Sequence, residues 1–253
     1  MGIRYWLQAG AVALFGGERC LRCGKPSGSL PLCSSCRPLL EDYLPLFAPD
    51  LRCRVCGKPL LSEIGLCMQC RSRPVLTCTD GVYPLHVYRL WTKSLLHAWK
   101  AEGRRTLSPL FAGLLARSLH ELSEHFAAGS PLPLVPVPPR PGKIRRSGWD
   151  QISELCALLK KDHGQTVLPL LRRLSSGEQK KRGRRERLAA AKSAYVYAPS
   201  RSALRRIKKE GLPAAVVLLD DVLTTGATLE ACAQALKAAG VRTVYAVTLF
   251  IVD

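Results

Sequence analysis

The chain has 253 residues, enough for one substantial hydrophobic core and a small accessory module. Hydrophobic residues make up 47% of the chain, which allows ordinary core burial and excludes a chain too polar to fold. Lys and Arg number 38 against 19 Asp and Glu, so the formal net charge of +19 favours polyanionic ligands over cationic ones.

The first apolar segment, residues 5–15, is interrupted by Gln8 and Gly10. It is shorter than the about 20 residues that a membrane-spanning helix requires. Arg4 precedes it as in some signal peptides, but no A-x-A cleavage pattern follows. We interpret residues 1–18 as an amphipathic segment that leads into the first module, and we expect a cytoplasmic protein without a membrane span.

Eight cysteines in four CxxC pairs dominate the next stretch. In the first set nine residues separate the two pairs, and in the second set ten residues do so. Two residues between thiolates let both sulfurs of a tight turn face one ion, and two such pairs complete a tetrahedral zinc site. The predicted zinc ligands are Cys20, Cys23, Cys33, Cys36, Cys53, Cys56, Cys67 and Cys70.

The near-equal spacing of the two sets predicts a duplicated unit, a double zinc ribbon over residues 19–76. Each set offers four thiolates and implies no open position, so we expect two structural zinc ions. Nothing else in the sequence indicates the oxidising compartment that disulfides require. The spacing leaves open whether the CxxC pairs combine within or between repeats. It also leaves open whether the ribbons present a surface to a partner or only stabilise a region with too little core.

Alternating strands and helices follow, an order typical of an α/β fold with a parallel sheet. Predicted strands cover residues 81–88, 134–138, 167–174, 215–219 and 241–252, and predicted helices cover residues 91–100, 107–126, 151–160, 201–209 and 229–239. The histidines of the first two helices show no metal-ligand spacing, and Cys78, Cys156 and Cys232 stand alone, so core packing or surface exposure explains them.

The stretch VVLLDDVLTTGATLE, residues 216–230, carries the main chemical signal. Asp220 and Asp221 follow a buried strand, at the edge where open α/β sheets bind ligands. The start of a helix stabilises an anion, and threonine hydroxyls add donors. A sugar phosphate satisfies both features, because its hydroxyls donate to the carboxylates while its phosphate occupies the loop. The predicted phosphate loop comprises Thr224, Thr225, Gly226, Ala227 and Thr228.

The segment DDVLTTGAT resembles the phosphoribosyl pyrophosphate (PRPP) signature of type I phosphoribosyltransferases. From about Cys20 to the C-terminus, the chain resembles the ComF family of competence-associated, phosphoribosyltransferase-like proteins. The resemblance implies a type I phosphoribosyltransferase-like sheet with flanking helices over residues 77–253. It implies PRPP with Mg²⁺ as ligands, and Asp220 and Asp221 as the catalytic carboxylates that orient the ribose. It also implies a role in DNA uptake and natural competence.

The same resemblance indicates which cations face the pyrophosphate. Lys100 ends a helix where ComF-like chains have a lysine, although a surface lysine at a helix C-terminus is an alternative. The loop before residue 151 matches a family run, with Asp150 where an amide is expected. A mobile loop over the bound PRPP corresponds to residues 175–192. The pyrophosphate-side candidates are Lys100, Arg145, Arg146, Arg184 and Arg187, with Arg140 and Lys143 beside them.

Two functions remain open from the sequence. One is Mg²⁺-dependent phosphoribosyl transfer to a nitrogen nucleophile. The other is a non-catalytic adaptor that retains the transferase fold and binds single-stranded DNA, with a competence helicase or other DNA-uptake proteins as partners. Residues 140–209 contain 20 Lys and Arg against 5 Asp and Glu, which fits polyanion binding or a solvated face. Few aromatic residues interrupt this belt, which argues against an extended base-stacking platform.

Overall fold

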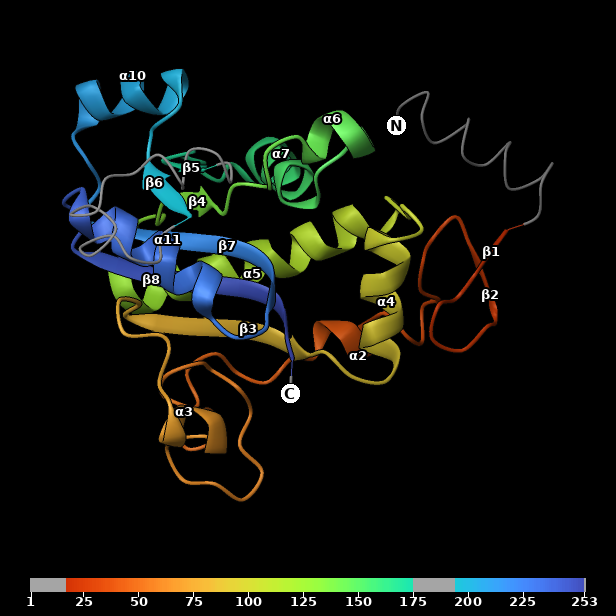
Figure 1. Ribbon diagram of the computed structural model, residues 1–253. Coiled ribbons are helices and arrows are strands. Elements are labelled where there is room, and N and C mark those ends of the chain that lie inside the picture. Colours follow the sequence, from red (N-terminus) through yellow and green to blue (C-terminus); the bar gives the residue numbers. More distant parts are fainter. Residues whose placement is uncertain (1–16, 175–193, 253) are drawn as a thin grey trace.

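A parallel sheet lies at the centre of the chain in the computed structural model, which describes residues 17–174 and 194–252 (Figure 1). Its four strands are ordered β3-β8-β7-β4 and are parallel throughout. They are β3 (Gly81–Val87), β4 (Leu134–Pro136), β7 (Ala215–Leu223) and β8 (Thr243–Ile251). An isolated parallel bridge joins Leu134 to Val167 beyond β4. The α/β fold class predicted from the sequence is confirmed.

The two central strands are apolar because both faces of the sheet are covered. Along β7, Val217 and Leu219 point into one hydrophobic cluster, while Val216 and Leu218 point into another. All four side chains are fully buried. The strand is longer than predicted, since its pairing with β8 continues past Asp220 to Leu223. The two carboxylates therefore lie within the last part of the strand, and strand pairing fixes their backbone.

Helices form a layer on each side of the sheet (Figure 1). The first layer consists of α4 (Trp91–Lys100), α5 (Leu107–Ala127) and α7 (Gln151–His163), and the second of α11 (Ala227–Ala238). In α7 the N-cap is Asp150, whose carboxylate accepts a hydrogen bond from the Ser153 N–H at 2.9 Å. Asp150 thus caps the start of α7.

Shorter elements complete the described chain. Ser200 is the N-cap of helix α10 (Arg201–Glu210), and its hydroxyl accepts a hydrogen bond from the Ala203 N–H. The antiparallel pair β5 (Leu171–Arg173) and β6 (Tyr195–Tyr197) packs against α11. The predicted strand over residues 167–174 is thus a bridge at Val167 followed by β5. The remaining elements are α6 (Lys143–Ser147), β1 (Glu18–Arg19), β2 (Pro26–Gly28), α2 (Pro38–Glu41) and α3 (Met68–Ser72).

The two cysteine-rich repeats pack against different layers of the domain. The first repeat, with β1, β2 and α2, buries Leu32 and Leu40 in the cluster that contains α4 and α5. The second repeat, with α3, buries Leu60 and Leu76 in the cluster that contains α11. Figure 1 shows the first repeat beside α4 and the second below β3. The repeats have similar sequences but different structural surroundings.

Arg52 connects the repeats to the sheet. Its buried guanidinium donates hydrogen bonds to the carbonyl oxygens of Pro45 at 2.8 Å, Gly57 at 2.8 Å and Pro84 at 2.9 Å, and also to Leu44. Burial lowers the pKa of Arg52 to about 10, so the group stays charged at neutral pH. One side chain thus joins the linker between the repeats, the second repeat and β3.

Trp99 provides a test of the core. Its ring is 0% exposed, packs edge-on to Phe111 at 4.9 Å between ring centroids, and donates from Nε1 to the Ser108 hydroxyl. Trp99→Ala is expected to lower the free energy of unfolding by roughly 3 to 5 kcal/mol, because it leaves a cavity between α4 and α5. Urea denaturation measures the change. Leu61→Ala, at a side chain that is 86% exposed, serves as the control and should have little effect.

Candidate functional site

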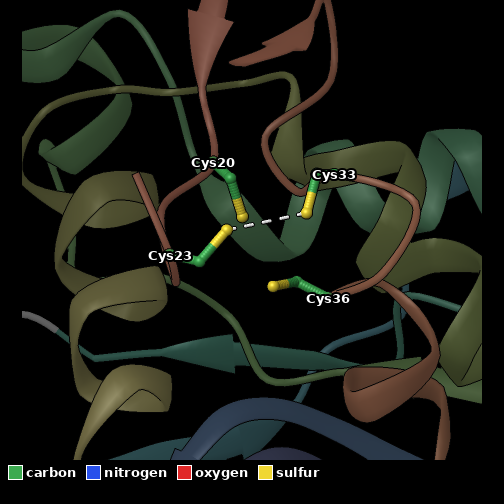
Figure 2. Close-up of side chains that lie close together, drawn as sticks. All are labelled: Cys20, Cys23, Cys33 and Cys36. Carbon is green, nitrogen blue, oxygen red and sulfur yellow. Dashed lines mark hydrogen bonds between the residues drawn. The ribbon is translucent and has the colours of Figure 1, made fainter. Parts of the chain in front are cut away.

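The cysteines form two separate clusters, each built within one repeat. In each cluster the four sulfur atoms lie within 4.8 Å of one another. The Cys23 and Cys33 sulfurs are 3.7 Å apart (Figure 2), and those of Cys56 and Cys67 are 3.8 Å apart. A tetrahedron with Zn–S bonds of about 2.3 Å has edges of about 3.8 Å. The distances therefore suit zinc. The CxxC pairs combine within each repeat and not between the repeats.

The first cluster comprises Cys20, Cys23, Cys33 and Cys36, and the second comprises Cys53, Cys56, Cys67 and Cys70. Burial raises the pKa of Cys20, but hydrogen bonds from the backbone N–H groups of Cys33, Cys23 and Arg22 have the larger combined effect. The pKa of Cys20 is therefore lowered to about 6. Similar hydrogen bonds outweigh burial at Cys53 and lower its pKa to about 7. Each cluster thus contains a sulfur prepared to bind as a thiolate, and each can hold a metal ion.

The two clusters differ in exposure. In the second, all four cysteines are buried, whereas in the first Cys23 is exposed and Cys33 is partly exposed. Arg22 lies over the first cluster, with Nη1 3.7 Å from the Cys36 sulfur and its guanidinium 5.4 Å from the centroid of the Trp91 ring. A chelator in solution therefore reaches the first cluster more easily than the second.

We expect the purified protein to contain two zinc ions per chain, as measured by elemental analysis. A chromogenic chelator should remove them in two phases, the faster from the first cluster. Cys33→Ser with Cys36→Ser should abolish the fast phase only, and Cys67→Ser with Cys70→Ser the slow phase only. Release in a single phase from the wild type would contradict the assigned difference in exposure.

The two predicted carboxylates lie at the C-terminal end of β7, where the predicted phosphate loop begins. The Asp221 Oδ2 is 2.7 Å from the Lys100 Nζ, and this ion pair joins β7 to the end of α4. The Asp220 Oδ1 accepts a hydrogen bond from the Asp221 N–H at 2.8 Å. Lys100, a pyrophosphate-side candidate in the sequence, thus lies next to the acidic pair.

Asp220 is the carboxylate whose pKa the site perturbs most clearly. Burial raises its pKa, and the adjacent Asp221 carboxylate raises it further. The Asp221 N–H and the charges of Lys100 and Lys143 lower the pKa only in part, so it remains at about 7. The carboxylate is therefore held near the point of protonation at neutral pH. A group that brings donors or positive charge to this position is stabilised there.

The loop after β7 turns sharply into α11. Gly226 has φ of +80°, a conformation that favours glycine, and it precedes the first residue of the helix. Glycine has no side chain to cap the helix, so the first-turn N–H groups can serve an anion. Thr224 and Thr225 are exposed beside them, and Thr225 Oγ1 accepts a long hydrogen bond of 3.4 Å from the Ala227 N–H. These features are the ones that a phosphate-binding loop requires.

The segment before α7 includes the short helix α6, and its Lys143 lies close enough to lower the pKa of Asp220. Lys143 donates to the Asp150 carboxylate at 2.8 Å and also to the Gln151 side-chain oxygen. Asp150, at the position where the resemblance implies an amide, is thus a helix cap and a partner of Lys143. Arg140 and Arg145 are exposed. The side chain of Arg146, and all of Arg184 and Arg187, lie outside the residues that the structure describes.

Two residues near the predicted phosphate loop, Tyr195 and Arg173, belong to no motif that was recognised in the sequence. The Tyr195 hydroxyl forms a hydrogen bond with the Thr228 side chain. Burial is the main cause that raises the Tyr195 pKa, and the nearby Asp220 carboxylate also raises it. The Arg173 guanidinium lies 5.3 Å from the centroid of the Tyr195 ring. The pair β5-β6 therefore brings an aromatic and a cationic side chain to the predicted phosphate loop. Alternation in the run Tyr195–Tyr197 indicates a strand but not its neighbour.

Comparison with curated proteins finds a relative whose similarity to this chain extends over most of both sequences. The sequence is 26% identical to competence protein ComFC of Streptococcus pneumoniae over 219 residues, which cover 84% of each chain. No protein-family model matches the chain. With the two four-cysteine clusters, the similarity supports the family expected from the sequence.

Other sequence-based expectations for this ComF-like chain can be compared with the structure. Cys156 and Cys232 are buried, as core packing predicts, and burial raises the pKa of both thiols. His97 lies on the surface near Glu102, and His125 stacks on Phe47 at 3.9 Å between ring centroids. Among the described residues, no helix is both long and apolar enough to cross a bilayer. The amphipathic segment predicted for residues 1–18 lies almost wholly outside the described residues.

Asp220→Asn should stabilise the folded chain at alkaline pH. The folded-state pKa of about 7 exceeds the ordinary value of 3.8, so the stability linked to Asp220 protonation is lost as pH rises toward and through 7. An amide removes this penalty and the repulsion by Asp221. We expect a gain of roughly 1 to 3 kcal/mol at pH 8 and a smaller gain at pH 5.5.

Urea denaturation at the two pH values measures the effect of Asp220→Asn. The control is Asp162→Asn, because Asp162 is exposed on α7 and the change in charge is the same. A gain that is equal at pH 5.5 and pH 8 would show that the raised pKa of Asp220 is not its cause.

Proposed function

We propose that the chain binds PRPP at the C-terminal end of β7 and, with Mg²⁺, transfers the phosphoribosyl group to a nitrogen nucleophile. The observation that carries the proposal is the combination of adjacent carboxylates, an uncapped helix start after Gly226, and a lysine paired with Asp221. A sugar with a phosphate at one end and a pyrophosphate at the other presents complementary groups to all three. The fold of the domain, an open parallel sheet, favours ligand binding at this same edge.

In the proposed complex the ribose hydroxyls donate hydrogen bonds to Asp220 and Asp221. These donors stabilise the ionised form of Asp220, whose pKa of about 7 indicates that the protein alone leaves the carboxylate under-compensated. The 5′-phosphate accepts hydrogen bonds from residues 224–228. Lys100 faces the pyrophosphate, together with the arginines at positions 145, 146, 184 and 187.

The residues present fit a magnesium ion, because carboxylate oxygens are the protein ligands that Mg²⁺ prefers. Bound with PRPP, the ion would neutralise pyrophosphate charge and make it a better leaving group. The C1–oxygen bond to pyrophosphate breaks with its electron pair on the leaving oxygen, and the lone pair of the nitrogen forms the new bond to C1. The nitrogen then loses a proton. Asp220 and Asp221 orient the ribose and stabilise the positive charge that develops on its ring.

The relative supports a proposal for the biological setting. The curated protein of Streptococcus pneumoniae is named a competence protein, and we extend that role to this chain. We place its activity in DNA uptake during natural competence, with single-stranded DNA and a helicase or other uptake protein as candidate partners. The proposed compartment is the cytoplasm.

A second candidate function is a DNA-binding adaptor without transferase activity. Helix α10 supports this function, because its exposed side chains include Arg205, Arg206, Lys208 and Lys209. Glu210, which pairs with Arg206, is the one acidic residue of this helix. Such a face attracts phosphates, and its affinity for DNA would fall steeply with salt. The two functions are compatible with one fold, so binding of PRPP and of DNA must be measured separately.

Asp220→Ala combined with Asp221→Ala is expected to raise the Kd for PRPP with Mg²⁺ about a hundredfold or more, since both acceptors for the ribose hydroxyls are lost. Titration calorimetry on the zinc-loaded protein measures the affinity. The fold should persist, because the change removes repulsion from the end of β7. Asp50→Ala with Asp162→Ala removes the same charge from exposed positions and serves as the control.

An unchanged Kd in the double Asp220 and Asp221 variant would reject the site. If the wild type binds PRPP, release of pyrophosphate in the presence of nucleobases or amines tests transfer. If the wild type binds only single-stranded DNA, with strong salt dependence, the adaptor function replaces the transferase.

A further inference from the structure

We propose that the second four-cysteine unit, residues 53–76, is a positioning element for the phosphate loop. In this view, metal bound by Cys53, Cys56, Cys67 and Cys70 holds residues 224–228 in the form that binds the 5′-phosphate, without touching the ligand. The first four-cysteine unit has no such role. The inference rests on the proposed PRPP site, and it adds a structural dependence of that site on one of two similar metal clusters.

The closest connection is between Leu76 and Gly226. A Cβ built on Gly226 would lie 2.9 Å from the Leu76 Cγ and 3.2 Å from each of its methyl groups. Leu76 is 8% exposed and follows Cys70 by only six residues. The side chain thus fills the space against the glycine at the turn into α11. Any shift of Leu76 would leave the left-handed turn at Gly226 unsupported on that side.

A second connection runs through Glu230 in the first turn of α11. Its carboxylate is buried and accepts hydrogen bonds from the Thr77 N–H at 2.8 Å, the Thr77 hydroxyl at 2.5 Å and the Cys78 N–H at 3.0 Å. These bonds outweigh the effect of burial and lower the Glu230 pKa. The chain that leaves the second unit is therefore fixed to the helix whose start forms the phosphate loop.

The space between the unit and the loop is nearly filled. A cavity of about 20 Å³ is lined by Cys56 and Cys70 on one side and by Thr224, Thr225 and Gly226 on the other. It is too small for a phosphate group, so it is a packing gap and not a second ligand site. Lys58 and Arg73 also line it and add positive charge behind the loop. Both metal-ligand turns of the unit therefore lie against the phosphate loop.

Metal is needed for this support because the second unit has little core of its own. Its largest apolar side chains away from the sheet, Leu61, Ile64 and Met68, are 86%, 89% and 76% exposed. A segment of this length with so little burial depends on metal for its fold. The first unit packs instead on α4 and α5, through Leu32 and Leu40. Loss of its metal would leave the contacts of Leu76 and Glu230 in place.

The test combines PRPP titration with hydrogen exchange of the peptide covering residues 223–230, on the full zinc-loaded chain. Leu76→Ala should retain both zinc ions, speed exchange in this peptide, and raise the Kd for PRPP about tenfold. Leu76→Met, which refills most of the space, should restore both values. Glu230→Gln, which weakens the bonds to Thr77 and Cys78, should act in the same direction as Leu76→Ala. Ile64→Ser, in the same unit but away from the loop, is the matched control.

Removal of metal tests the dependence itself. Cys67→Ser with Cys70→Ser should speed exchange in residues 223–230, whereas Cys33→Ser with Cys36→Ser should leave exchange in this peptide as in the wild type. Equal effects of the two cluster variants, or wild-type exchange and PRPP affinity in Leu76→Ala, would overturn the inference. If the wild type binds no PRPP, the proposed function fails, while the exchange measurements still decide whether the metal unit supports the loop.

Discussion

Two adjacent carboxylates at the end of a buried strand repel each other, and the surroundings of Asp220 and Asp221 compensate for that repulsion only in part. Pairing of β7 with β8 continues through this point, so the backbone cannot relax to separate them. Lys100 approaches from α4 to pair with Asp221, and Lys143 contributes positive charge from the start of α6. Asp220 retains a pKa of about 7. A site that is incompletely compensated without ligand is one that gains most when hydroxyl donors and cations arrive.

The order of the elements explains why these compensating groups converge. Strands β4 and β7 are parallel neighbours, so the segments that follow them, the loop before α7 and the predicted phosphate loop, emerge at the same edge of the sheet. Helix α4 follows β3 and ends in Lys100 next to Asp221, although 121 positions in sequence separate the two residues. The pair β5-β6 packs on α11 and brings Tyr195 to Thr228. Four segments distant in sequence thus contribute to one edge.

Most of the fold was predictable because its signals are local. The alternating β and α elements, the four-sulfur spacing and the DDVLTTGAT segment each need only a short stretch of sequence. The C-terminal limit of β7 could not be predicted in this way, because the pairing of this part of β7 with β8 is a long-range property. Asp150 looked like a defect where an amide was expected. Its place directly before the helix predicted from residue 151 is a local N-cap signal, but its pairing with Lys143 depends on how the preceding segment folds back. Tyr195 and Arg173 were missed for the same reason.

The two cysteine repeats show how duplication and function can separate. Their ligand spacing is nearly the same, so the same local chemistry makes two similar four-sulfur clusters. Their surroundings differ, since one repeat extends the layer of α4 and α5 and the other lies beneath the predicted phosphate loop. Metal binding stabilises whatever the bound unit contacts, and the contacts are set by packing, which the ligand spacing does not encode. A duplicated motif can therefore acquire two roles without any change in its metal ligands, through the choice of a residue such as Leu76 that faces Gly226.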